Sequence, residues 1–271
     1  MHSPASFSQD DAALPHPQVI MPHTDPEEEL EYLAYVISHD LQTSVRHVGS
    51  FSHLLAEAAQ QAIPDQPRLV ELANTLTEVS DTLETRVHAV LTYSRIGRRH
   101  LQWVPIDLRD LLDAVRSTQQ AQIEAQQPQL LTRLEVDTWP GDFHLLWQLL
   151  SILLDNALRF TRLTGQPEIR LTLTRSADER LSIRCTDNGV GFDPRRQRRL
   201  FRLFSVLHSR TEYSHVGLGT GLAMARRIVQ RLGGTMVAEG QPGQGATFAV
   251  HLPYHCPVRH SQLPEELQYL R

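Results

Sequence analysis

Asn156 and Arg159 have side chains suited to a magnesium ion and a phosphate group. They stand three residues apart in 142–160, an apolar-rich stretch that predicts a helix, so they share one helix face. A carboxamide oxygen is a ligand type that Mg²⁺ accepts, and a guanidinium pairs well with phosphate. Helices often carry Asn and Arg on a solvated face, so this pair is a weak signal by itself.

A carboxylate follows a predicted strand at Asp187, in the run Asp-Asn-Gly-Val-Gly. Alternate residues of 180–186 are apolar, and Asp187 continues that alternation onto the buried face. A buried carboxylate needs a hydrogen-bond donor, and the exocyclic amine of adenine is a good one. Gly189 and Gly191 would let the backbone approach a flat base closely. A turn with an Asp cap explains this run equally well.

A glycine loop precedes a predicted helix at 222–232. Gly217, Gly219 and Gly221 alternate with other residues immediately before Leu222. Such a loop presents free N–H groups and the positive end of the helix dipole to phosphates. The later stretch 242–248 predicts a turn and a strand that closes a sheet.

His39 is the candidate nucleophile of the N-terminal half. It lies about 200° from the apolar stripe of its predicted helix, so we expect it to face solvent. The chain has 14 histidines, so exposure alone proves little. The neighbouring Asp40 can hold the imidazole tautomer and accept a proton while the other nitrogen attacks a phosphoryl group. Thr43 shares the exposed face.

Two amphipathic helical runs, joined by the break 63–67, predict a helical hairpin over 26–100. Apolar residues such as Leu41 and Val48 form one stripe, and Leu72 and Val79 belong to the other. A single hairpin cannot cover both stripes, so two hairpins should pair as a four-helix bundle. We therefore expect a homodimer, although the stripes could instead pack on the rest of the same chain.

The remainder of the chain predicts a two-layer α/β sandwich over 104–253, which makes the fold class α+β. Helices are expected at 106–125, 142–160 and 222–232, and strands at 168–174, 180–186, 235–239 and 246–252. Residues 1–25 are expected to be a flexible leader and 254–271 a tail.

Composition excludes several other functions. The 271 residues have 41% hydrophobic content and a formal net charge of −5, so neither nucleic acid nor membrane insertion is expected. The longest uncharged stretch, 144–154, is too short to span a bilayer, and no signal peptide is visible. The two cysteines have no metal-ligand spacing, so a reducing, cytoplasmic setting is expected.

The four motifs of the second half, in this order and spacing, resemble the ATP-binding domain of histidine kinases and their relatives, the gyrases and ninety-kilodalton heat-shock chaperones. The resemblance implies that ATP and Mg²⁺ are the cofactors. It implies Asn156 as the magnesium ligand, Arg159 as a phosphate contact and Phe160 as the aromatic residue on adenine. It further implies these roles: Asp187, with Gly189 and Gly191, for adenine; Gly217, Gly219, Gly221 and Leu222 for the ATP lid; Thr247 for a water-mediated adenine contact.

The stretch around His39 resembles the dimerisation and phosphoacceptor helix of sensor histidine kinases, most closely those of the phytochrome-like class. That resemblance implies autophosphorylation of His39 and transfer to an aspartate of a response regulator receiver domain. The Asp40 to Thr43 spacing also resembles a pattern linked to dephosphorylation of the regulator, which stays open. Because 1–25 are too few residues for a sensor domain, we expect either that a separate protein supplies the input or that this chain is part of a larger system.

Two positions depart from the family pattern. Ile152 stands where hydrolytic relatives have a water-activating Glu and many kinases a second Asn, and Ser44 replaces a usual proline. These departures keep open a degenerate ATP-binding scaffold with little kinase activity. A serine kinase of the anti-sigma-factor type would lack the hairpin, and a gyrase-like ATPase would need the missing base.

Overall fold

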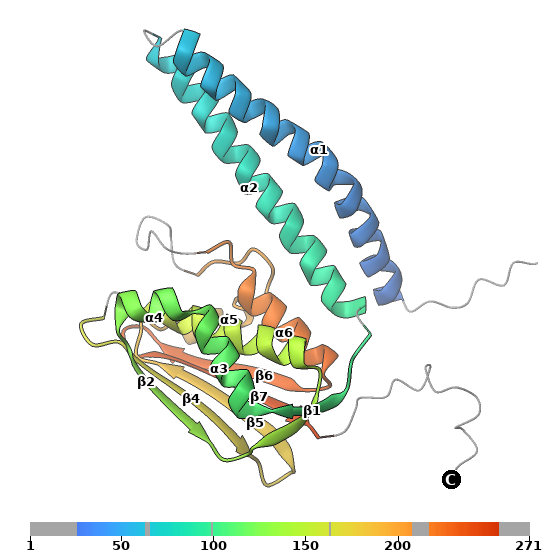
Figure 1. Cartoon of the computed structure of the whole chain (residues 1–271), viewed down its shortest axis with the longest axis vertical. Coiled ribbons are helices and arrows are strands. Elements are labelled where there is room, and N and C mark those ends of the chain that lie inside the picture. The colour runs from blue at the N-terminus through green and yellow to red at the C-terminus, as the bar shows by residue number, and fades with distance from the viewer. Residues whose placement is uncertain (1–25, 63–65, 99, 163, 208–216, 255–271) are drawn as a thin grey trace, which may run out of the picture.

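A hairpin of two long helices, α1 (Pro26–Ala62) and α2 (Pro67–Arg98), projects from a domain built on a β-sheet (Figure 1). The structure, a computed structural model, describes residues 26–62, 66–98, 100–162, 164–207 and 217–254, with side chains from Leu41 onward. In these ranges, no helix has the length and apolar character needed to cross a membrane.

Small side chains fill the contact between the two hairpin helices. The hydroxyl groups of Ser52 and Ser80 lie 3.0 Å apart in a hydrogen bond, and Ala56 packs near Ala73. Towards the acceptor end, Val45 joins α2 residues in a second buried cluster. The contact thus combines small side chains near the loop with the larger Val45, Val87 and Leu91 towards the other end of the hairpin.

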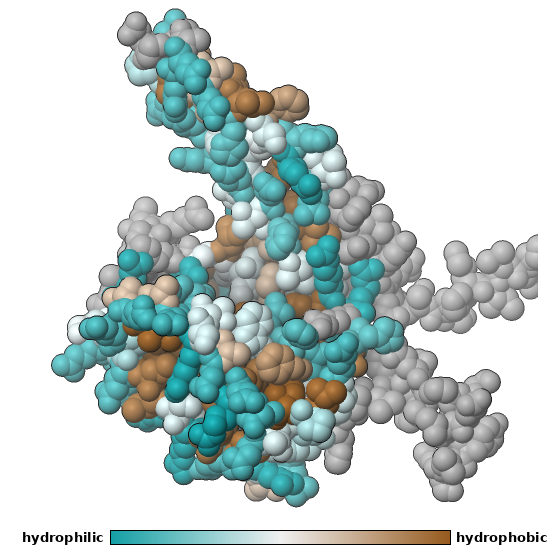
Figure 2. Space-filling model, viewed as in Figure 1, coloured by the Kyte–Doolittle hydropathy of each residue, from teal (hydrophilic) through white to brown (hydrophobic). Residues whose placement is uncertain are grey.

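Large apolar side chains of the hairpin lie on its outer surface in the single chain. Phe51 is 71% exposed and Leu54 60% exposed on α1, and Val79 is 59% exposed on α2. Figure 2 shows brown side chains of this kind on the hairpin surface. Members of both expected stripes are exposed, namely Leu41, Val48, Leu55, Leu69, Leu72, Leu76, Val79 and Leu83.

Five strands form the main sheet in the order β2–β4–β5–β7–β6. The edge strand β2 runs parallel to β4, and the other neighbours are antiparallel. Their bounds are β2 (Gln129–Leu134), β4 (Glu168–Arg175), β5 (Arg180–Asp187), β6 (Thr235–Gln241) and β7 (Gly245–Pro253). The expected mixed α+β architecture is confirmed, with α3 (Leu108–Thr118), α5 (Phe143–Thr161) and α6 (Gly221–Arg231) on one face of the sheet (Figure 1).

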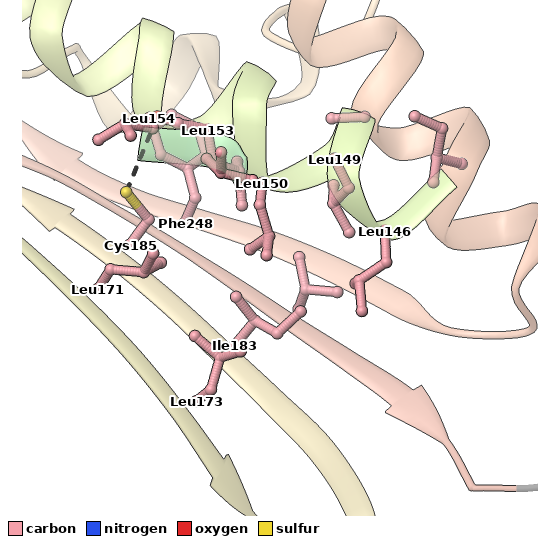
Figure 3. Packing of buried hydrophobic residues seen from close by; sticks show 14 of the residues in the cluster. Leu146, Leu149, Leu150, Leu153, Leu154, Leu171, Leu173, Ile183, Cys185 and Phe248 are labelled. Carbon is pink, nitrogen blue, oxygen red and sulfur yellow. Dashed lines mark hydrogen bonds between the residues drawn. The ribbon is translucent and has the colours of Figure 1, made fainter. Parts of the chain in front are cut away.

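The core of this domain lies between α5 and the sheet. Leu149, Leu150 and Leu153 follow one another at helical spacing and are fully buried. They meet alternating strand residues, such as Leu173 and Ile183, as Figure 3 shows. The burial of these side chains holds α5 against β5. These two elements supply most of the polar residues of the candidate functional site.

The segment 104–141 differs from the sequence expectation. The predicted helix 106–125 begins only at Leu108, because the Asp107 carboxylate accepts hydrogen bonds from the N–H groups of Arg109 and Asp110 and caps the helix there. The residues before it form β1 (Val104–Asp107). A break at Gln119 divides the predicted helix into α3 and α4 (Gln120–Gln126). The elements of this segment that were not predicted are β1, β2 and β3 (Thr138–Gly141).

The hairpin contacts the sheet domain through α2. The Arg86 guanidinium lies 5.9 Å from the ring centre of Phe204, and the Arg227 guanidinium of α6 lies 5.6 Å from that of Tyr93. Near the end of α2, Ile96 enters the core of the sheet domain itself. These contacts set the two parts against each other.

Candidate functional site

A cavity of about 480 Å³ opens between α5 and the start of α6. Its walls come mainly from three regions distant in sequence: the polar face of α5, the end of β5 with the following loop, and the glycine loop before α6. Residues of 200–207 and of β7 complete them. The lining residues that the sequence analysis singled out are Asn156, Arg159, Phe160, Asp187, Gly191, Gly217, Gly219, Gly221 and Leu222. The structure thus brings most of the predicted binding residues to one cavity.

Asp187 is the buried carboxylate of this cavity. It ends β5 on the face that points towards α5 and is 4% exposed. Burial raises the pKa of its carboxyl group to about 6, although hydrogen bonds from the backbone of Gly189 and Ala246 act to lower it. The Gly189 N–H donates to Oδ1 at 2.9 Å. A ligand that donates a hydrogen bond to this carboxylate would be favoured, because desolvation has already weakened its contact with water.

Two glycines keep the backbone beside Asp187 close to its neighbours. A Cβ on Gly189 would lie 2.5 Å from the Phe160 carbonyl oxygen, so the loop packs directly on the end of α5. Gly191 has φ of +63°, and a Cβ there would lie 1.9 Å from the Gln241 carbonyl oxygen. Gly191 lines the cavity, whereas Gly189 supports it from outside.

Replacing Gly191 by alanine should destabilise the domain by about 3 kcal/mol or more, because both a positive φ and a backbone clash oppose the new Cβ. Gly243 is the matched control, since it has φ of +75° but nothing within 4 Å of its Cβ position. Gly243→Ala should therefore show only the cost of the left-handed conformation, about 1 kcal/mol. Urea unfolding of both variants measures the difference. Equal losses would refute the clash.

The α5 wall of the cavity is polar at one end. Asn156 and Arg159 both line it, as the helical spacing predicted. The Arg159 guanidinium donates to the Asp155 carboxylate at 2.9 Å and also lies beside the glycine loop, where a Cβ on Gly217 would be 3.2 Å from its Nη1. Ile152, one turn earlier, contributes an apolar patch.

The glycine loop covers the cavity from the side of α6. Gly219 has φ of +71°, and a Cβ there would lie 2.4 Å from the Ser205 carbonyl oxygen. Helix α6 begins at Gly221, so its N-terminal N–H groups face the same space. A phosphate at this position would meet those groups and the positive end of the helix dipole.

Thr247 is one predicted site residue that the structure does not bring to this cavity. Its hydroxyl lies 3.1 Å from that of Thr186, its partner across β5 and β7, and both line an adjoining cavity that shares Asp187, Phe192 and Ala246 with the first. Ala246, which pairs with Asp187, lines both cavities. Strand alternation counted back from the buried Phe248 would have identified Ala246.

The sequence analysis also missed residues that no motif singled out. Asp155 and Ser205 line the cavity, as does Phe192, which is 5% exposed. Asp155 directly precedes Asn156, the predicted metal ligand. This neighbouring position on the helix could have identified Asp155 from the sequence.

The predicted acceptor lies on α1. His39 and Asp40 fall within this helix, but their side chains lie outside the described ones, which begin at Leu41. Thr43, one turn after His39, is exposed. Val45 packs against Val87 and Leu91 of α2. The part of α1 that contains His39 therefore lies near the C-terminal end of α2.

The cavity residues fit a nucleotide with a magnesium ion. The base end offers a desolvated carboxylate and glycine backbone, and the opposite end offers amide and carboxylate oxygens with one guanidinium. In addition, the Ser151 hydroxyl oxygen on the cavity wall is buried without a hydrogen-bond partner among the described residues. An unsatisfied oxygen of this kind suits a ligand or a hydrated ion.

Comparisons with known proteins agree with this geometry. Residues 141–255 match the family model for histidine kinase-, DNA gyrase B-, and HSP90-like ATPases. Cyanobacterial phytochrome A of Nostoc sp. is 32% identical over 226 residues, which cover 83% of this chain and 28% of that protein. Phytochrome-like protein Cph1 of Synechocystis sp. is 29% identical over 83% of this chain and 29% of that protein. The chain thus spans less than a third of these relatives' length.

Two solved structures share the fold. Full-length ShkA, in complex with AMPPNP, has a TM-score of 0.61 at 24% identity and covers 84% of this chain and 47% of that one. Histidine kinase AdeS of Acinetobacter baumannii has a TM-score of 0.53 at 18% identity, over 75% of this chain and 95% of that one. The chain therefore shares the fold of these two structures, and residues 141–255 of its sheet domain match the histidine kinase-, DNA gyrase B- and HSP90-like ATPase family.

Proposed function

We propose that the chain phosphorylates its own His39 from Mg²⁺-ATP and passes the phosphoryl group to an aspartate of a response regulator receiver domain. The observation that carries this proposal is the cavity beside α5, where a buried carboxylate at one end faces polar and basic groups at the other. The match of residues 141–255 and the histidine-bearing hairpin support it.

Each end of the cavity has its own part in binding. Asp187 accepts a hydrogen bond from the exocyclic amine of adenine, and Phe160 packs on the base. Asn156 binds the metal ion through its amide oxygen, and Arg159 contacts the phosphates together with the N–H groups at the start of α6. A bound Mg²⁺ supplies charge neutralisation at the phosphates; the protein supplies position.

The transfer itself takes place on α1. One imidazole nitrogen of His39 attacks the γ-phosphorus, the bond from that phosphorus to the β-phosphate oxygen breaks, and ADP leaves. Asp40 accepts the proton from the other ring nitrogen. In the second step, a carboxylate oxygen of the receiver attacks the phosphorus and the phosphorus–nitrogen bond breaks. If the chain also dephosphorylates the receiver, which is a separate hydrolytic reaction, the exposed Thr43 would position the attacking water.

The outer face of the hairpin supports a homodimer. Large apolar residues such as Phe51, Leu54 and Val79 are more than half exposed in the single chain, while small residues fill the contact between α1 and α2. Pairing of two hairpins would bury these side chains in a four-helix bundle. The second copy of this chain is thus the partner that their chemistry fits.

Ile152 favours one competing function, an ATP-binding scaffold with little transfer. Its aliphatic side chain lines the cavity where a kinase of this family often has a second amide. The same residue argues against ATP hydrolysis as the main activity, since it cannot activate water.

Incubation of the protein with Mg²⁺ and ATP labelled at the γ-phosphate separates these functions. We expect a stable protein-bound label that acid removes and base does not, as for a phosphorus–nitrogen bond. Transfer of that label to an added receiver domain would support the second step. ATP binding without label would establish the scaffold, and release of inorganic phosphate without label would establish a hydrolase.

A further inference from the structure

The metal end of the cavity contains a carboxylate that the family pattern does not assign. Asp155 directly precedes Asn156 on α5, and both side chains line the cavity. Ile152 lies one turn before Asn156, and its aliphatic side chain lines the same wall of the cavity. A Cβ on Gly221 would lie 3.4 Å from the Cγ2 atom of Ile152. An ion at Asn156 therefore receives no oxygen from position 152.

When no nucleotide is bound, the Asp155 carboxylate forms an ion pair with the Arg159 guanidinium. The Arg159 guanidinium donates to its Oδ2 at 2.9 Å, and the Gln122 amide approaches Oδ1 at 3.4 Å. The two charged side chains are 31% and 33% exposed, so water reaches this pair from the cavity. An exposed ion pair between neighbours on one helix contributes little to stability, so its members can exchange partners easily.

Ser151 adds a second oxygen beside Asp155. The two residues are four positions apart on α5, so they lie on adjacent turns of one face. The Ser151 Oγ is buried and has no hydrogen-bond partner among the described residues, although it borders the cavity. A buried hydroxyl without a hydrogen-bond partner destabilises the folded state. A hydrated cation held at Asp155 would satisfy it, because metal-bound water donates hydrogen bonds to such oxygens.

We propose that Asp155 holds the magnesium ion with Asn156, directly or through bound water, and so replaces the oxygen that Ile152 lacks. The inference rests on the proposed nucleotide-binding function. When Mg²⁺-nucleotide binds, Arg159 exchanges the Asp155 carboxylate for a phosphate, and the freed carboxylate turns to the metal. The Arg159 guanidinium and the Asp155 carboxylate are paired with each other before the exchange, and with a phosphate and the metal ion after it.

The test compares nucleotide affinity with and without the metal. Calorimetric titration with ADP is carried out in Mg²⁺ and in EDTA, and the ratio of the two affinities measures metal coupling. We expect Asp155→Asn to reduce this ratio about tenfold or more while affinity in EDTA changes little. Glu124→Gln, which removes an exposed carboxylate on the nearby α4, should leave the ratio unchanged.

A rescue variant guards against a purely structural effect. Adding Ile152→Asn to Asp155→Asn should restore much of the metal coupling, because it returns an amide oxygen to the adjacent turn. An unchanged ratio in Asp155→Asn, or an equal loss in Mg²⁺ and in EDTA, overturns the inference and leaves the proposed function standing. Absence of ADP binding by the unaltered protein in both conditions overturns the proposed function itself, and this inference with it.

Discussion

His39→Gln is expected to reduce phosphoryl incorporation to the background level and to leave nucleotide affinity unchanged. Glutamine matches histidine in length and polarity, but its amide nitrogen is not a nucleophile, so no phosphorus–nitrogen bond can form. Binding should persist because the cavity is lined by residues from the sheet domain and not by α1, within the described part of the chain. The experiment measures labelled γ-phosphate on the protein and, in parallel, the affinity for ADP.

A matched control lies on the same helix. His47 is exposed on α1, and His47→Gln should incorporate label at the rate of the unaltered protein. Persistent label in His39→Gln would place the acceptor elsewhere. Loss of label in both variants would indicate damage to the hairpin, which circular dichroism of α1 and α2 would reveal.

The second large effect is expected at Asp187, where one substitution should remove binding and raise stability together. Asp187→Asn replaces an acceptor carboxylate by an amide whose NH₂ group would face the adenine amine. A donor opposed to a donor leaves both unpaired in a buried place, so nucleotide affinity should fall about 100-fold or more. Adenine-nucleotide titration measures this loss.

The stability change follows from the raised pKa of Asp187. Its ordinary value is 3.8 and burial raises it to about 6, so the folded state holds this proton more tightly than the unfolded state. Stability contributed by this group is therefore full below about pH 4, falls as the pH rises to about 6, and stays lost above it. The neutral Asp187→Asn variant avoids this loss and should be more stable at pH 7.5, by up to about 3 kcal/mol.

Urea unfolding at pH 7.5 and pH 4.5 distinguishes this cause from others. The advantage of Asp187→Asn should shrink at the lower pH, where the carboxyl group of the unaltered protein is protonated too. Asp178→Asn, on the exposed turn before β5, is the control and should show no such gain at pH 7.5. A variant at position 187 that is destabilised at both pH values would contradict the desolvation argument. The charged Asp187 carboxylate that would bind the nucleotide thus lowers the stability of the folded protein at neutral pH.

Local periodicity explains how much of the site could be predicted. The strand alternation through Leu181, Ile183 and Cys185 placed Asp187 on the buried face, and the structure agrees. Helical spacing placed Asn156 and Arg159 together for the same reason. Both predictions depend on residues within one element, whose geometry the chain itself dictates.

Pairing between distant segments explains what was missed. The edge strand β2 pairs with β4 across more than thirty residues of sequence, and its side chains alternate only between exposed and half-buried. Thr247 was assigned to adenine by motif likeness, yet the pairing of β5 with β7 turns it to the opposite face from Asp187. Asp155 was not predicted as a metal ligand, because the role proposed for it follows from Ile152, which departs from the family pattern.

The hairpin and the sheet domain differ in how they complete their apolar cores. The sheet domain closes its core within one copy, around leucines such as Leu149 and Leu153. The hairpin places its small residues inside and its large ones, such as Phe51, outside. In the proposed homodimer, mass action therefore governs the stability of the hairpin bundle and not that of the sheet domain: dilution weakens the bundle, whereas the sheet domain keeps its stability at any concentration.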